Sequence, residues 1–162
     1  MKNIKFSRLF AAFAFVAILA LAGCKQPEEE TPYAIEGTWV DSTGAKFEIT
    51  HSELKNTYVN NGVTCDSYAG NELTVEQTSD TSGTIFIKYT RAMNPDWTYS
   101  ESAPDVGKWY AVSYKSLTDT SVEFAGAWKP NGETSCETLE DAKAEFTSDN
   151  GYYGEYTTYT RQ

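Results

Sequence analysis

The sequence predicts a mainly β protein, an antiparallel up-and-down β-barrel of about eight or nine strands with one short helix before the last strand. Three observations favour this fold. Short runs rich in β-branched and aromatic residues follow one another from residue 37 onward, each broken by turn residues. These runs are half polar, so each strand has one face toward solvent, as antiparallel sheets do. A single segment, residues 138–146, has helical periodicity. A β-sandwich is the alternative.

The first strands are predicted between residues 37 and 78. "GTWVD" and "KFEIT" come first, separated by a Ser-Thr-Gly-Ala turn. "LKNTYV" and "VTCDSY" are expected to form a hairpin around Asn60-Asn61-Gly62, because Asn-Gly tolerates the positive φ of a tight turn. A bend at Ala69-Gly70 then separates "VTCDSY" from a further strand, "NELTVEQT".

The second half continues the series. "TIFIKYTR" is the clearest strand, and "GKWYAVSYK" with "SVEFAGAW" forms a second predicted hairpin. The helix follows, with Thr138 as N-cap and with Leu139, Ala142 and Phe146 at helical spacing. The last strand is expected in "YYGEYTTYTR".

The first residues have the pattern of a secretory signal peptide: a basic start, then an uncharged apolar run from Leu9 to Ala22. The four residues Leu21 to Cys24 resemble the lipobox of bacterial lipoproteins. The resemblance implies cleavage before Cys24 and acyl chains on that residue, which would hold the protein in a membrane. Residues 1–23 are thus the predicted signal peptide, 24–34 the lipidated cysteine and a flexible tether, and 35–162 the barrel domain.

This leader predicts a lipid-anchored protein of the bacterial cell envelope. Lys25 follows the predicted lipidated cysteine, where enterobacterial lipoproteins retained at the inner membrane carry Asp, so the outer membrane or cell surface is favoured. The net charge is −10, and it becomes −13 when residues 1–23, with three basic and no acidic side chains, are removed. Such a charge argues against nucleic acid as a partner.

Two cysteines remain after the leader, Cys65 and Cys136. Export permits a disulfide between them, and two free thiols are the alternative. Neither belongs to a Cys-x-x-Cys motif, which leaves redox catalysis and structural zinc without local support.

A Gly-x-Trp triplet occurs three times, beginning at Gly37, Gly107 and Gly126. Only the first copy precedes enough chain to complete a barrel. There the sequence resembles lipocalins, which carry this triplet at the head of the first strand. The resemblance implies that Trp39 plugs the closed end of the barrel and that a basic residue, Arg161, covers it through a cation–π contact.

The sequence gives almost no support for catalysis. His51, Ser52 and Glu53 are adjacent, and neighbouring strand residues point to opposite faces, so they do not form a triad. The sequence also lacks a Gly-rich phosphate loop and a His/Cys metal cluster, and we predict no enzyme, metal or cofactor.

The segment from Ala92 to Val106 is longer than a hairpin needs and carries Met93, Trp97 and Tyr99. Long loops on a rigid scaffold often bind partners. The prediction is therefore a lipoprotein that binds a small apolar or amphipathic ligand inside the barrel. A surface interaction, adhesin-type or carbohydrate-binding module without an internal ligand is the alternative, and an envelope structural or inhibitor domain is a third.

Overall fold

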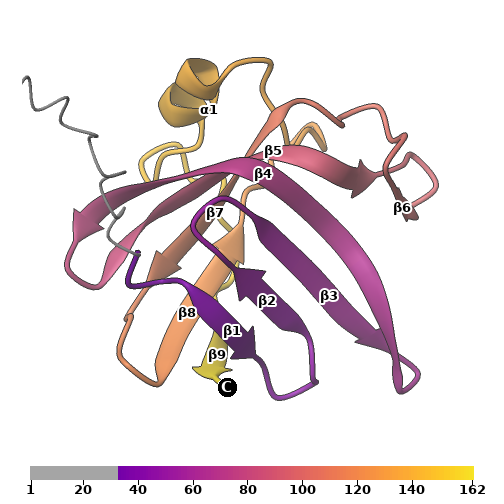
Figure 1. Ribbon diagram of the computed structural model, residues 1–162. Helices are drawn as coiled ribbons and strands as arrows, with labels where there is room; N and C mark the ends of the chain where they lie inside the picture. Colours follow the sequence, from indigo (N-terminus) through magenta and orange to yellow (C-terminus); the bar gives the residue numbers. More distant parts are fainter. Residues whose placement is uncertain (1–32) are drawn as a thin grey trace, which may run out of the picture. The chain divides into compact units, whose positions relative to one another are not determined.

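The β-forming runs of the sequence pair into one antiparallel sheet that closes on itself (Figure 1). The computed structural model describes residues 33–162. The predicted signal peptide, Cys24 and most of the tether lie outside these residues. The elements are β1 (Gly37–Val40), β2 (Lys46–Ile49), β3 (Leu54–Asn60), β4 (Val63–Ser79), β5 (Ser82–Met93), β6 (Tyr99–Ser100), β7 (Trp109–Lys115), β8 (Ser121–Gly126), α1 (Leu139–Glu145) and β9 (Thr157–Arg161).

The strand order confirms the predicted barrel. Neighbouring strands run β4-β3-β2-β1-β9-β8-β7-β5, and a further pairing of β4 with β5 closes the ring. These eight strands form the barrel, and the two-residue β6 is added beside β5. Because the first and last strands of the ring are hydrogen bonded, the molecule is a barrel and the alternative of a sandwich is wrong.

The strand β4 differs from the prediction at Ala69-Gly70. The chain does not turn there, and β4 continues as one strand of 17 residues. Gly70 faces β5, where a Cβ atom would lie 2.7 Å from the carbonyl oxygen of Lys88 and 2.8 Å from the Cβ of Ile87. The register of the β4–β5 ladder also shifts between Ala69 and Gly70. Gly70 therefore permits a close approach of β4 and β5, and it does not bend the chain as predicted. Close approach of another strand is a common role of glycine inside a strand.

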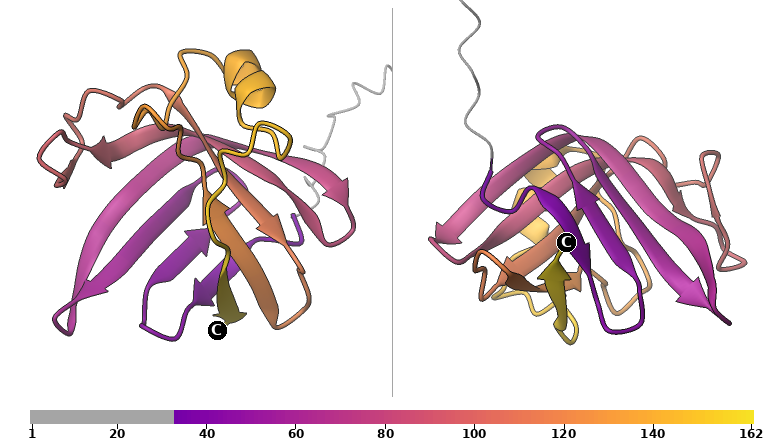
Figure 2. Two further views of the ribbon diagram at one scale, coloured as in Figure 1. Left: turned by 180° about the vertical axis from the view of Figure 1, so that it is seen from behind. Right: turned by 60° about the horizontal axis from the view of Figure 1, so that its bottom comes forward.

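The helix α1 forms where it was predicted. The Thr138 hydroxyl accepts a hydrogen bond from the Asp141 amide (3.1 Å) and donates one to the Asp141 carboxylate (2.7 Å), so both residues stabilise the first turn. Ala142 and Phe146 are buried, and the helix lies beside β5 and β7 (Figure 2).

Aromatic side chains fill the interior of the barrel. Trp39 lies edge-on to Phe124, and the ring centroids of Phe124 and Phe47 are 4.5 Å apart. Tyr68 lies 6.2 Å from Phe47 and 5.0 Å from Tyr110 by the same measure. We call the six residues in this series the aromatic chain: Trp39, Phe124, Phe47, Tyr68, Tyr110 and Tyr89.

The described residues form one compact unit with its own hydrophobic core, the property expected of a domain that folds alone. Among residues 33–162 we find no helix with the length and apolar character needed to cross a membrane.

Candidate ligand site

Trp39 and Arg161 meet at one end of the aromatic chain. The two residues are register partners on β1 and β9, and the guanidinium carbon of Arg161 lies 4.1 Å from the centroid of the Trp39 ring. Trp39 is fully buried, and its indole nitrogen donates to the carbonyl oxygen of Ile35 (2.8 Å). Arg161 also donates to the carbonyl oxygens of Ala34 (2.8 Å) and Asp119 (2.9 Å). The structure thus brings together the pair that the lipocalin resemblance implies.

The first glycine of the Gly-x-Trp triplet has a packing role at this end. Gly37 adopts φ +135°, and a Cβ there would lie 2.6 Å from the Nη1 atom of Arg161. A side chain at residue 37 would occupy part of the place that the guanidinium group takes over Trp39.

The two cysteines are both free thiols, so the structure does not contain the disulfide that the sequence permits. Cys65 lies on β4, opposite Tyr58 of β3. Cys136 forms an isolated bridge with Trp109 at the start of β7. Burial raises the pKa of the Cys136 thiol, which keeps it protonated at neutral pH.

The segment from Ala92 to Val106 is more ordered than an open loop. Its first residues complete β5, and Tyr99 and Ser100 return as β6 beside Ala92 and Met93. Trp97, in the turn between β5 and β6, is 69% exposed and adopts φ +68°. A bulky residue with positive φ is an outlier that its surroundings must impose.

Hydrogen bonds around the turn hold this conformation. The backbone amide of Asn94 donates to the carbonyl oxygen of Thr98 (2.7 Å). The backbone amide of Trp97 donates to the carbonyl oxygen of Asn94 (3.0 Å). The Asp96 carboxylate accepts from the hydroxyl (2.6 Å) and the amide (3.1 Å) of Thr98. These two hydrogen bonds lower the pKa of Asp96, which therefore carries its charge at neutral pH.

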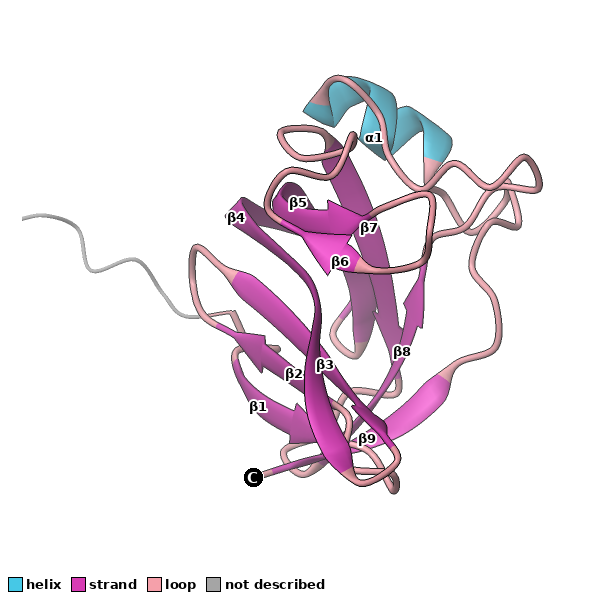
Figure 3. Cartoon of the chain, turned by 90° about the vertical axis from the view of Figure 1, so that its right-hand side faces the viewer, coloured by secondary structure: helices cyan, strands magenta, loops and turns pink. Residues whose placement is uncertain are grey.

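The three residues predicted from this segment, Met93, Trp97 and Tyr99, line one surface hollow of about 430 Å³. The other lining residues come from β3 and β4. In Figure 3, β6, which carries Tyr99, lies in front of β5 and β7. We call it the aromatic hollow; its lining is Asn56, Tyr58, Ser67, Tyr68, Met93, Trp97 and Tyr99.

Two further hollows adjoin the aromatic hollow, and Tyr68 lines all three. The inner hollow, of about 140 Å³, reaches Tyr89, Tyr110 and Trp128. The charged hollow, of about 420 Å³, holds five charged residues: Glu48, Lys55, Asp66, Arg91 and Glu101. Tyr68 thus links the aromatic chain inside the barrel to the surface.

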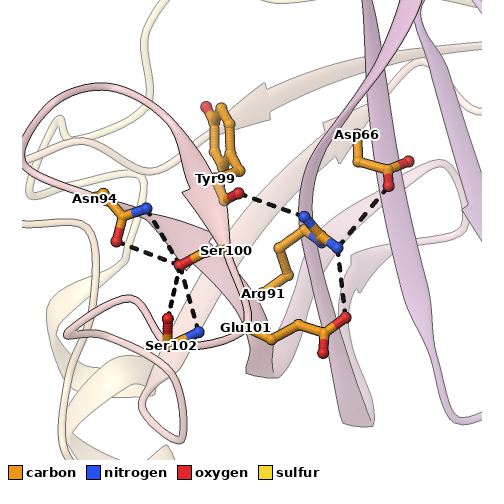
Figure 4. Close-up of polar contacts among 7 residues, drawn as sticks. All are labelled: Asp66, Arg91, Asn94, Tyr99, Ser100, Glu101 and Ser102. Carbon is orange, nitrogen blue, oxygen red and sulfur yellow. Dashed lines mark hydrogen bonds and ion pairs between the residues drawn. The ribbon is translucent and has the colours of Figure 1, made fainter.

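Arg91 is the central cation of the charged hollow (Figure 4). Its guanidinium group donates to the carbonyl oxygen of Tyr99 (3.4 Å) and to the Glu101 carboxylate (3.4 Å). A third oxygen, from Asp66, lies 3.9 Å away. Two carboxylates of the charged hollow, Asp66 and Glu101, therefore offset the charge of Arg91.

Sequence reasoning found one wall of the aromatic hollow and missed the other. Tyr58 and Tyr68 lie on β3 and β4, and only the barrel closure brings them beside the β5–β6 turn. Trp128 follows β8, and its ring stacks on that of Trp97, with centroids 6.1 Å apart and planes 13° apart. The high tyrosine content was the sole signal for Tyr58 and Tyr68.

Groups able to act in catalysis or bind metal are sparse in the described part of the chain. His51 stacks on Tyr33 (centroids 5.0 Å apart), and its Nδ1 lies 3.2 Å from the Glu36 carboxylate. Within residues 33–162 we find no group of three or more His, Cys, Asp or Glu side chains placed to bind a metal ion. Comparison with protein-family models and with curated proteins finds no match to this chain.

Proposed function

We propose that this protein is a lipid-anchored lipoprotein of the bacterial cell envelope that binds a small amphipathic ligand in the aromatic hollow of a lipocalin-like barrel. The anchor is the set of acyl chains on Cys24, in the outer membrane or at the cell surface. The protein binds its ligand without chemical change, and it needs no cofactor or metal for this.

The observation that carries the proposed ligand site is the lining of the aromatic hollow. Three tyrosines, a tryptophan and a methionine provide apolar area, and Asn56 and Ser67 provide polar groups beside them. Sites for small molecules combine an apolar lining with a few polar groups, and about 430 Å³ lies within their usual range of roughly 300–1,000 Å³.

The proposal places the ligand at the surface of the barrel and not deep inside it. The aromatic chain occupies the interior from Trp39 to Tyr110, with Trp39 fully buried. Cores are packed closely, so a ligand there would have to displace several rings. At the aromatic hollow, by contrast, Tyr58 is 38% exposed and Trp97 is 69% exposed. A ligand bound there is favoured because it removes the apolar surface of these two rings from water.

The leader supports the proposed anchor. The "LAGC" sequence ends an apolar run, and the polar residues 25–34 give a spacer that reaches about 30 Å when extended. Several acyl chains anchor a protein stably where one chain does not. The mass of the N-terminal peptide tests this part: an acylated Cys24 is expected, and an unmodified Cys24 contradicts the anchor.

Binding of N-phenyl-1-naphthylamine, a neutral apolar dye that fluoresces when it leaves water, tests the ligand site on the lipid-free domain, residues 25–162. We expect saturable binding that Met93→Asp weakens by about tenfold or more, since it places a charge in the apolar lining. Val63→Asp is the matched control, because Val63 is 62% exposed and lies outside the hollow. Equal affinity of the wild type and Met93→Asp would reject the site.

A second candidate function is contact with a surface partner or carbohydrate without an internal ligand. The exposed Trp97–Trp128 stack favours it, since tryptophan gives rigid contact area. Trp128 does not line the aromatic hollow. Loss of partner binding in Trp128→Ala, with saturable dye binding retained, would therefore indicate this second function.

A further inference from the structure

We propose that the aromatic hollow is a cage for a quaternary or alkylated ammonium group, so that the amphipathic ligand carries a cationic head. This inference rests on the proposed function, because it names the class of ligand that the same hollow takes.

The lining has the composition of an aromatic cage. Four of its seven residues are aromatic, and none carries a formal charge at neutral pH. The faces of tyrosine and tryptophan rings are electrically negative and attract a cation within about 6 Å of the ring centroid. Alkylated ammonium groups suit such sites because they cannot form the full set of hydrogen bonds with water that a lysine ammonium forms.

Tyr58 and Tyr99 are neighbouring, tilted rings in this lining. Their ring centroids are 6.3 Å apart, and their planes are tilted by 50°. At this separation one cation can lie within about 6 Å of both centroids. Tyr58 comes from β3 and Tyr99 from β6, so two elements far apart in the sequence provide the two walls.

The surrounding charge favours a cation over an anion. The adjoining charged hollow contains three carboxylates and two basic groups, and two of those carboxylates, Asp66 and Glu101, are paired with Arg91. Asp96 adds a further negative charge on the Trp97 turn. The whole chain has a net charge of −10, which raises the local concentration of cations around it.

The turn fixes Trp97 as a wall of the cage. The ring is held outward by a left-handed backbone, which the hydrogen bonds of Asn94, Asp96 and Thr98 maintain. Trp128 supports it from one side by stacking. A wall that is already in position loses little conformational freedom when the ligand binds, which strengthens binding.

Calorimetric titration of the acylated protein in a non-ionic detergent tests the inference with two probes of equal shape. One is choline, and the other is 3,3-dimethylbutan-1-ol, in which a neutral carbon replaces the charged nitrogen. We expect choline to bind at least about fivefold more tightly, since both fill the same space and only choline has a cation–π attraction. Equal binding of the two probes, or binding of neither while the naphthylamine dye binds, would overturn the cage and leave the proposed function standing.

Paired variants show whether the ring faces carry the preference. In Tyr58→Phe with Tyr99→Phe the rings remain, and the preference for choline should persist. In Tyr58→Leu with Tyr99→Leu similar apolar volume remains without these two rings, and the preference for choline over the neutral alcohol should fall clearly below that of the wild type. Unchanged melting temperatures control for folding. A preference that survives the leucine pair would contradict the cage, and a neutral disaccharide that binds more tightly than choline would favour the carbohydrate function in its place.

Discussion

Single residues at the Trp39 end of the aromatic chain show how the Gly-x-Trp triplet works. Trp39 fills the interior, Arg161 covers its ring, and Gly37 leaves space for the guanidinium group. Arg161 also binds backbone oxygens before β1 and after β7, so one side chain joins three parts of the chain. The triplet at Gly37 is therefore explained by packing and does not itself indicate a ligand.

Trp39→Ala should destabilise the protein by about 3–5 kcal/mol, because it removes a fully buried ring and leaves a cavity. Arg161→Ala should destabilise it by about 0.5–2 kcal/mol through the lost cation–π contact, and the lost hydrogen bonds to backbone add to this. Urea denaturation measures both. Trp97→Ala serves as the exposed control, and a stability loss there equal to that of Trp39→Ala would show that burial is not the cause.

At the scale of elements, the pairing of β4 with β5 turns a sheet into a barrel. The two strands approach closely at Gly70, where the carbonyl of Lys88 and the side chain of Ile87 occupy the space of a Cβ atom. The same closure brings Tyr58 and Tyr68 beside the β5–β6 turn, so the aromatic hollow depends on it.

Gly70→Ala should therefore destabilise the barrel by about 1–3 kcal/mol, the usual cost of adding a methyl group to a filled space. Gly154→Ala is a matched control, since a Cβ atom at residue 154 meets nothing within 4 Å. The midpoint of urea denaturation reports the difference. If both variants unfold at the wild-type midpoint, the close approach of β4 and β5 is not as described.

The sequence predicted elements better than it predicted which residues meet. The helix was found because Thr138, Ala142 and Phe146 have local spacing and capping chemistry. Gly70 was misread as a bend, because a glycine used for close packing and one used for turning have the same local sequence. Similarly, Trp97 and Tyr99 were found from their loop, whereas Tyr58 reaches the same hollow only through barrel closure.

At the scale of the whole molecule, the barrel encloses tyrosines that remain protonated in the folded state. Burial raises the pKa of Tyr68 and Tyr89 well above the ordinary 10.0, and it raises the pKa of Tyr153 and Tyr159 to about 12. Unfolding exposes these hydroxyls to water, where they ionise near pH 10.

The stability should consequently fall in alkaline solution. Below about pH 10 these tyrosines are protonated in both states, and their effect on stability is constant. From about pH 10 to 12 the unfolded chain releases protons that the folded chain retains, so the free energy of unfolding decreases as pH rises. Melting temperatures across this window measure the effect. The melting temperature of Tyr159→Phe should fall less steeply with pH than that of the wild type. An identical slope of melting temperature against pH would contradict the raised pKa of Tyr159.

The central claim is that a ligand binds in the aromatic hollow while the barrel interior stays filled. The indole N–H signals of the four tryptophans in NMR spectra test this claim most directly. The lipid-free domain, residues 25–162, is titrated with N-phenyl-1-naphthylamine, and each signal is assigned with a Trp→Phe variant. We predict that the Trp97 signal shifts progressively, and that the Trp39 signal, whose N–H is bonded to Ile35, does not move. A shift of Trp39 with Trp97 unchanged would place the ligand inside the barrel and contradict the account.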